Sequence, residues 1–346
     1  MHVPDGFIDA PISAATGVVA AAAVAVSLRG ARRELDERTA PLAGLVAAFI
    51  FAVQMLNFPV AAGTSGHLLG GALAAILVGP YTGVLCVSVV LLMQGILFAD
   101  GGLTALGVNI TDMAVVTTVV AYAVFRGLVK VLPRKRGSIT AASFVAAVLS
   151  VPAAAVAFTL IYAVGGTTDV SIAKVATAMI GVHVLIGIGE AVITALTVGA
   201  VIAVRPDLVY GARGLQQKLK LRVDGQLVDV PAEPNPVAAR SHRKVWITGL
   251  VTSVVLAGFV SFYASADPDG LEKVAADKGI DAKTEKHATA DSPLADYGVK
   301  DVEDARLSGG LAGVIGVGVT VVAGSTVFWV VRRRRTADTS PVGTGV

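Results

Sequence analysis

Long apolar stretches, separated by short polar ones, run through almost the whole chain. A helix that crosses the hydrocarbon core of a membrane needs roughly 20 predominantly apolar residues. By this criterion the pattern predicts nine membrane-spanning helices, at about residues 12–28, 41–56, 67–80, 82–99, 107–126, 138–165, 175–204, 245–264 and 309–331. The third stretch is short and rich in glycine. We therefore predict an all-α membrane protein, with a compact seven-helix core and two C-terminal transmembrane helices.

The composition favours a membrane protein and argues against a nucleic-acid partner. Hydrophobic residues make up 54% of the 346 residues and charged residues only 15%, whereas a soluble domain has about a quarter of its residues charged. The mean hydropathy is +0.74. The formal net charge of +3 is too small to attract a polyanion. We expect the membrane as a partner, and no nucleic acid.

Positive charge is distributed unevenly between the loops. With the N-terminus outside, the inner segments are 29–40, 127–137, 205–244 and the tail after 331, and these hold most Lys and Arg residues. Apart from Lys174, no Lys or Arg occurs in the outer loops, 57–66, 100–106 and 166–174. Cytoplasmic loops carry an excess of Lys and Arg. We therefore expect a multi-pass protein of a bacterial plasma membrane, with the N-terminus outside and the C-terminus in the cytoplasm.

The same pattern predicts four regions. Residues 1–204 form a compact transmembrane core, 205–244 a proline-containing cytoplasmic linker, 245–331 a two-helix region with an external loop, and 332–346 a basic cytoplasmic tail. The external loop, 265–308, carries eleven acidic and six basic residues. Such a loop can concentrate cations through its field, or it can be a solvated spacer.

Two of the five histidines lie where they can bind a metal ion. The α-amine of Met1, the backbone nitrogen of His2 and its imidazole Nδ1 can close two fused chelate rings around one ion. His67 lies in the glycine-rich loop 63–71 on the same predicted side and can supply a fourth nitrogen. Four nitrogens in a plane favour Ni(II) or Cu(II), and Co(II) also accepts them. A structural or solvated role for His67 is the alternative.

Several polar residues are predicted to lie beside these ligands. Asp5 can orient a ligand from an outer position, and Asn57, Ser65 and Asn109 are expected to line the same site. Polar groups inside membrane helices are costly, and they are usually functional or paired. The others of this kind are Gln54, Gln94, Asp100, Asp112, His183 and Glu190. Hydrogen bonds between helices are the alternative role for these groups.

The chain lacks the motifs of common hydrolases and ATPases. No HExxH, GxSxG, Walker A or CxxC pattern occurs, so we expect neither an enzyme nor an ATPase. Two roles for the candidate metal site stay open: a membrane metal-dependent enzyme that uses His183 and Glu190, and a metal sensor that does not transport.

Four motifs together resemble a known family. The segments MHVPDGF, GTSGHLLGG, MQGILFADGGLTALGVNITDM and HVLIGIGEAVIT are similar to the substrate-specific component of energy-coupling-factor transporters for cobalt and nickel. The resemblance covers about residues 1–204. The stretch Pro268-Asp269-Gly270-Leu271-Glu272 and the following Ser292 to Tyr297 resemble the small accessory component, fused here to the C-terminus.

The resemblance implies a metal ion as transported substrate, with no prosthetic group. It implies that Met1, His2 and the position of His67 hold Ni(II) or Co(II) in an all-helical membrane core. It also implies a transmembrane coupling protein and two ATPase subunits as partners, which drive import. Gly17, Ala21 and Ala25 place small residues along the first helix, where such a face can meet the coupling protein or serve internal packing.

Overall fold

The computed structural model describes residues 1–36, 39–61, 63–215, 220–223, 226–229 and 243–338. Within this part of the chain, regular structure is helical apart from two short β-hairpins. Seven helical stretches are long and apolar enough to cross a membrane: 10–34, 80–98, 106–131, 136–165, 172–204, 243–263 and 305–333. The predicted all-α membrane class is confirmed, and the chain is a multi-pass membrane protein.

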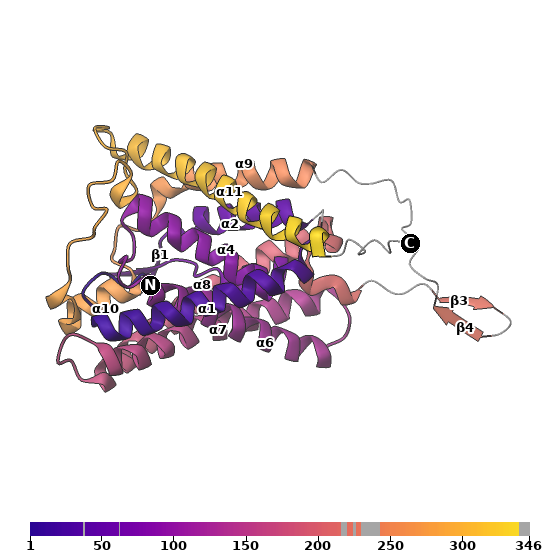
Figure 1. The fold of residues 1–346 in the computed structure, drawn as a ribbon, viewed down its shortest axis with the longest axis horizontal. Coiled ribbons are helices and arrows are strands. Elements are labelled where there is room, and N and C mark those ends of the chain that lie inside the picture. Colours follow the sequence, from indigo (N-terminus) through magenta and orange to yellow (C-terminus); the bar gives the residue numbers. More distant parts are fainter. Residues whose placement is uncertain (37–38, 62, 216–219, 224–225, 230–242, 339–346) are drawn as a thin grey trace, which may run out of the picture.

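The N-terminal part of the bundle consists of seven helical bodies (Figure 1). They are α1 (Ala10–Glu34), α2 (Thr39–Gln54), α3 (Gly71–Val78), α4 (Pro80–Met93) with the π-helical η1 (Gln94–Phe98), α5 (Leu106–Asn109) with the π-helical η2 (Ile110–Val116) and α6 (Thr117–Val131), α7 (Arg136–Gly165) and α8 (Ile172–Val204). The first helix begins where it does because the Asp9 carboxylate accepts a hydrogen bond from the Ile12 amide at 2.9 Å. Such a cap satisfies an amide that has no partner within the helix.

The third predicted span is the main correction to the expected helices. Residues 67–70 are not helical, and α3 has only eight residues. At 1.5 Å per residue, α3 spans about 12 Å, far less than the roughly 30 Å hydrocarbon core. Gly70 has a φ of +91° at the start of α3, a conformation that favours glycine. The apolar run 67–80 was long enough for a span, but the glycines around it break the helix.

The C-terminal helices α9 (Arg243–Gly258) and α11 (Ala305–Asp338) pack beside α2. Small residues bring these helices close together. A Cβ atom at Gly44 of α2 would lie 2.9 Å from the Ser325 backbone nitrogen, and one at Gly313 would lie 2.8 Å from the Ala257 carbonyl carbon. Because backbones can approach each other only where side chains are small, these glycines seat α11 against both neighbouring helices.

The α9–α11 connection, residues 264–304, contains the short helix α10 (Gly270–Lys278), which the sequence analysis treated only as part of a loop. Its first turn is a capping box. The Asp269 carboxylate accepts from the Glu272 amide at 2.8 Å, and the Glu272 carboxylate accepts from the Asp269 amide at 2.9 Å. This reciprocal pair satisfies two amides at once and starts α10 directly after Asp269.

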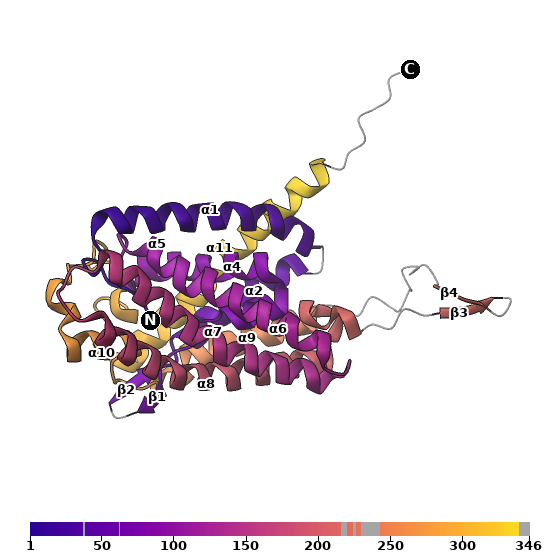
Figure 2. The same cartoon turned by 90° about the horizontal axis from the view of Figure 1, so that it is seen from below.

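One end of the bundle gathers the N-terminus, the hairpin of β1 (Phe58–Ala61) and β2 (Thr64–Gly66), and α10 (Figure 1). Helix α1 lies along one face of the bundle and α8 along the opposite face (Figure 2). The hairpin of β3 (Lys220–Val223) and β4 (Gln226–Asp229) stands at the other end. Residues 216–219, 224–225 and 230–242 of the predicted linker, 205–244, lie outside the described residues, as do residues 339–346 of the predicted tail.

The small residues of α1 divide between two environments. Gly17 is half-buried and packs against Gly107 of α5, whereas Ala21 and Ala25 are exposed. The contact of Gly17 supports the internal-packing role for that residue. The exposed part of α1 also carries Val18 and Val26, which are 70% and 54% exposed, so this face is open to lipid or to another protein.

Candidate metal centre

The N-terminal segment is threaded into the bundle and held by the loop between η1 and α5. Val3 is fully buried, and its amide donates to the Asn109 side-chain oxygen at 2.7 Å. The Val3 carbonyl accepts from the Asn109 side-chain nitrogen at 3.1 Å and from the Gly102 amide at 2.8 Å. Asp5 accepts from the amide and hydroxyl of Thr104 at 2.8 and 2.6 Å. These contacts fix the first residues of the chain against this loop and the last residue of α5.

Gly101 makes this close approach sterically feasible. Its φ is +78°, and a Cβ atom there would lie 2.9 Å from the Asn109 side-chain nitrogen and 3.3 Å from the His2 Cβ. A side chain at this position would therefore be strained by the backbone, would collide with the Asn109 amide and would crowd His2. Two π-helical segments, η1 and η2, flank the loop; such segments are frequent at functional sites.

The α-amine of Met1 lies between two side chains from distant parts of the sequence. It is 2.6 Å from His67 Nε2 and 2.7 Å from Asp269 Oδ2. Met1 itself is only 3% exposed, so these two groups replace water around the amine. His67 Nε2 and Asp269 Oδ2 are 3.5 Å apart. Three polar atoms thus meet in one buried place.

His67 directs its Nε2, with the lone pair of that nitrogen, at the Met1 amine. Its Nδ1 lies 3.0 Å from the Leu68 carbonyl oxygen, which can only accept, so we assign the ring proton to Nδ1. The residues after it are held by Glu190 of α8, which accepts from the Leu69 amide at 2.7 Å and the Gly70 amide at 3.2 Å. Such outer contacts fix the tautomer and the ring plane of a metal-binding histidine.

His2 lies against a second set of oxygens. Its Nδ1 is 3.2 Å from Asp100 Oδ1, and its Nε2 is 3.1 Å from Gln94 Oε1. Burial, with the Met1 ammonium and His67 nearby, lowers the pKa of His2 from 6.5 to about 4, although Asp100 opposes this. The ring is therefore neutral at pH 7 and carries one N–H. The other ring nitrogen keeps a lone pair, which is the form that binds a metal ion.

The oxygens around His2 are themselves tied to the α9–α11 connection. The Tyr297 hydroxyl donates to Asp100 Oδ2 at 2.5 Å and accepts from the Gln94 side-chain nitrogen at 2.9 Å. Burial and the neighbouring Asp100 carboxylate raise the pKa of Tyr297 well above its ordinary value, so its hydroxyl stays a donor. Tyr297 also stacks on Phe98, with ring centroids 4.9 Å apart.

Asp269 is the acidic member of the cluster. It is 7% exposed. Burial alone would raise the pKa of Asp269, but the Met1 ammonium and His67 hold it well below 3.8. A buried carboxylate that stays ionised needs a positive partner, and here the partner is the chain's own N-terminus.

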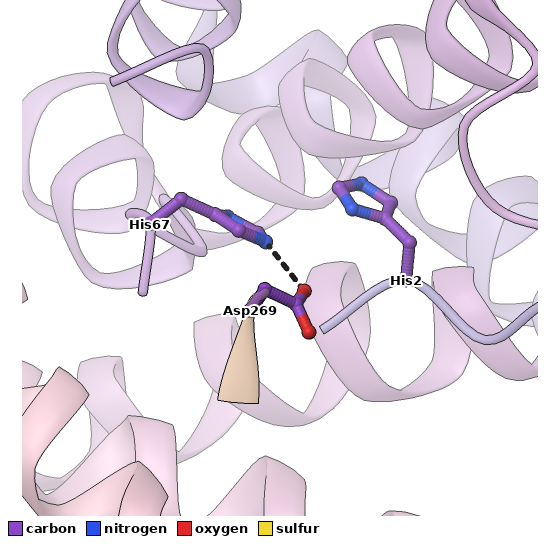
Figure 3. A group of neighbouring side chains, drawn as sticks. All are labelled: His2, His67 and Asp269. Atoms are coloured by element: carbon purple, nitrogen blue, oxygen red, sulfur yellow. Dashed lines mark ion pairs between the residues drawn. The ribbon is translucent and has the colours of Figure 1, made fainter. Parts of the chain in front are cut away.

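His2, His67 and Asp269 offer one ligand atom each, all within 4.8 Å of one another. Figure 3 shows the three side chains converging from three different segments. Imidazole nitrogen and carboxylate oxygen are ordinary ligands of divalent transition metals. Together with the Met1 amine, the cluster provides nitrogen and oxygen donors around one point.

The structure brings Met1, His2 and His67 together, and the four residues expected to line the site divide into two pairs. Asp5 and Asn109 hold the N-terminal segment. Ser65 donates to the Asp267 carbonyl at 2.7 Å through its hydroxyl, and to the Pro268 carbonyl at 2.9 Å through its amide. The Asn57 carbonyl accepts from the Ser265 amide at 2.7 Å. Ser65 and Asn57 therefore fix the segment that leads to Asp269 rather than touching a ligand.

Sequence reasoning missed Asp269 and Tyr297 as site residues. Both residues lie in the external loop, 265–308. Asp269 is one of eleven acidic residues there, and charge alone does not distinguish it from the others. The signal that could have singled out Asp269 is its spacing from Glu272, a capping-box pattern that predicts a helix start. A helix start fixes both the backbone and the side chain of its first residue.

Two residues considered for an enzymatic alternative have structural partners. Glu190 binds the backbone after His67, as described above. His183 Nδ1 lies 2.8 Å from the Met179 carbonyl oxygen, one turn earlier in α8. Its ring also lies against Gly270 of α10, since a Cβ atom there would be 3.3 Å from His183 Cε1. Both side chains are thus engaged by the neighbouring backbone.

A family model matches more than half of the chain. It is described as the cobalt uptake substrate-specific transmembrane region, CbiM, and it covers residues 2–208. The chain belongs to the CbiM family. A second model, the PDGLE domain, matches residues 243–333, which we call the PDGLE segment. The expected membership of the cobalt and nickel transporter family, with a fused accessory component, is confirmed.

Relatives with related names cover much of the chain. A putative metal transport protein of Haloquadratum walsbyi is 40% identical over 61% of this chain and 94% of its own length. A putative fused nickel transport protein of Archaeoglobus fulgidus is 38% identical over 66% of this chain and 75% of its own. The cobalt transport protein CbiM of Sorangium cellulosum is 34% identical over 60% of this chain and 94% of its own.

A solved structure supports the same fold. The crystal structure of a truncated transition metal transporter is 27% identical, with a TM-score of 0.52, and the match covers 59% of this chain and 99% of that one. The chain is therefore a cobalt/nickel transport component of the CbiM type. Such components work with other subunits.

Proposed function

We propose that this chain is the substrate-specific subunit of an ATP-driven importer, and that it captures Ni(II) or Co(II) in a chelate formed by Met1, His2 and His67. The metal ion is the transported substrate and not a prosthetic group. The family match and the names of the nickel and cobalt relatives support the substrate class. The observation that carries the chelate is the buried Met1 amine, 2.6 Å from His67 Nε2.

The spacing of these two nitrogens suits one metal ion. Two neighbouring donors in a square around an ion, each bound at about 2.0 Å, are about 2.8 Å apart. The separation of Met1 N and His67 Nε2, 2.6 Å, is close to that value. The backbone nitrogen and Nδ1 of His2 complete the square in the proposed complex. Four nitrogens in a plane favour Ni(II) over harder ions.

Binding requires three local changes. The Met1 ammonium and the His2 backbone amide must each lose a proton before their nitrogens can bind, and affinity will therefore rise with pH. His2 Nδ1, now 3.2 Å from Asp100, must turn from that oxygen to the ion. Because His2 is neutral in the fold, its imidazole needs no further proton loss before it can bind through a lone pair.

We further propose that the end of the bundle with Met1 faces the outside. Helix α1 ends near Arg32 and Arg33 at the opposite end, and the turn between α6 and α7 carries Arg134 and Lys135 there as well. Basic residues mark the cytoplasmic side. A transmembrane coupling protein and two ATPases are the proposed partners, with the exposed face of α1 as a contact for the coupling protein.

Metal accumulation in cells tests this function. Cells that produce the chain with the coupling protein and both ATPases are expected to accumulate radioactive Ni(II) or Co(II). Cells in which an ATPase subunit carries an inactivating Walker A substitution are expected to accumulate no more than cells without the chain. Equal accumulation with active and inactive ATPases would contradict an ATP-driven mechanism.

A further inference from the structure

We propose that Asp269 of the PDGLE segment binds the transported ion directly, through Oδ2, as a fifth ligand above the four nitrogens. This inference rests on the proposed function and adds to it. It makes the fused segment part of the metal site rather than a neighbour of it.

The distances fit an apical oxygen. Asp269 Oδ2 is 2.7 Å from Met1 N and 3.5 Å from His67 Nε2. An apical donor and a planar donor, each bound at about 2.0–2.2 Å, are about 3 Å apart. The two measured distances lie on either side of that value. A ligand atom of His2 also lies within 4.8 Å of a carboxylate oxygen of Asp269.

The carboxylate is fixed in this position by its own helix. Asp269 Oδ1 accepts from the Glu272 amide at 2.8 Å, so one oxygen caps α10 while the other faces the Met1 amine. The preceding carbonyl, of Pro268, accepts from the Ser65 amide at 2.9 Å, and Ser65 lies two residues before His67. The hydrogen bond between Ser65 and Pro268 thus joins the segment that carries His67 to the segment that carries Asp269. This connection preorganises the two ligands.

Charge gives a second reason for a carboxylate. The Met1 ammonium and the Asp269 carboxylate form a neutral buried pair at 2.7 Å. A buried carboxylate without a positive partner is costly. A divalent ion bound at this place supplies positive charge directly beside Asp269. Asp269 therefore balances the charge before and after the ion arrives.

A thiol at this position reports directly on contact with the ion. In Asp269→Cys of the full-length chain, loaded with Co(II), we expect a thiolate-to-cobalt charge-transfer absorption and a sulfur neighbour in the X-ray absorption spectrum. The matched control is Asp267→Cys, two residues earlier on the exposed surface, for which neither signal is expected. Thiolate is a strong ligand of such ions, so a side chain within reach will bind.

A serine variant measures the contribution to affinity. Serine keeps the helix cap, so Asp269→Ser should still fold, but it offers the ion only a neutral hydroxyl in place of the carboxylate. We expect its Ni(II) affinity to fall by at least roughly tenfold, the loss seen even for an outer partner of a metal ligand, while Asp267→Ser binds like the parent.

The two possible failures are distinguishable. If Asp269→Cys shows no cobalt–sulfur signal and Asp269→Ser binds Ni(II) like the parent, Asp269 is not a ligand and this inference is overturned. In that case the loss of binding in His67→Ala would still uphold the nitrogen chelate. If the parent itself binds neither ion, the proposed function and the inference are both wrong.

Discussion

Asn109 offers a sharp test of how the N-terminus is held. In Asn109→Ala, the buried Val3 amide loses its acceptor at 2.7 Å, whereas the Val3 carbonyl keeps the Gly102 amide at 2.8 Å. One buried donor is therefore left without a partner. Such a group costs roughly 1–3 kcal/mol. Without metal the terminus can move into water and avoid this cost, but a bound ion requires the terminus in place.

The expected result is weaker metal binding in a bundle that still folds. At about 1.4 kcal/mol per factor of ten, the cost corresponds to a roughly 5- to 140-fold loss of Ni(II) affinity, measured by calorimetric titration of the purified chain in detergent. The matched control is Thr118→Val, since Thr118 is buried and its hydroxyl has no hydrogen-bond partner among the described residues. A Ni(II) affinity of Asn109→Ala equal to that of the parent would refute the idea that the hydrogen bonds between Asn109 and Val3 position the N-terminal metal ligands.

Three further changes address the surroundings of the site. Tyr297→Phe removes the hydroxyl that donates to Asp100 at 2.5 Å and keeps the ring, so we expect Ni(II) affinity to fall by roughly 5- to 12-fold, for the roughly 1–1.5 kcal/mol net worth of a hydrogen bond, in the same titration. Gly101→Ala forces a side chain to within 3.3 Å of the His2 Cβ at a φ of +78°, so we expect weaker Ni(II) binding and a lower thermal midpoint. Parental values of both would show that the loop can accommodate a side chain at this position. Folding lowers the pKa of His2 from 6.5 to about 4, so the unfolded chain binds a proton first as the pH drops. The free energy of unfolding is therefore expected to decrease between pH 6.5 and 4, by up to about 3 kcal/mol. Thermal unfolding of the parent against His2→Asn over that pH range checks this, and parallel pH profiles would contradict it.

The fold class followed from the lengths of the apolar runs, because a helix of fixed rise must match a membrane of fixed thickness. The run at 67–80 was misleading for the same reason: its length suits a span, but Gly70 and Gly79, with φ of +91° and +104°, confine the helix between them. Length alone does not report where the backbone leaves the helical region.

The site was predictable only in part. Met1, His2 and His67 could be named because rare nitrogen ligands stood on one predicted side of the membrane. Asp269 and Tyr297 could not, because their roles depend on how the connection between the last two helices folds back over the N-terminus. That arrangement depends on contacts such as Ser65 with Pro268, which join segments about 200 residues apart and leave no periodic pattern.

The most direct test of the account is calorimetric titration of the purified chain with Ni(II) and with Co(II), repeated on His67→Ala and on a variant with one glycine inserted between Met1 and His2. The insertion keeps every side chain but enlarges the chelate ring. The account predicts tight binding by the parent and its loss in both variants, and the parental curves give the preference between the two metals. Binding by the insertion variant as tight as that of the parent would show that the N-terminus is not a ligand.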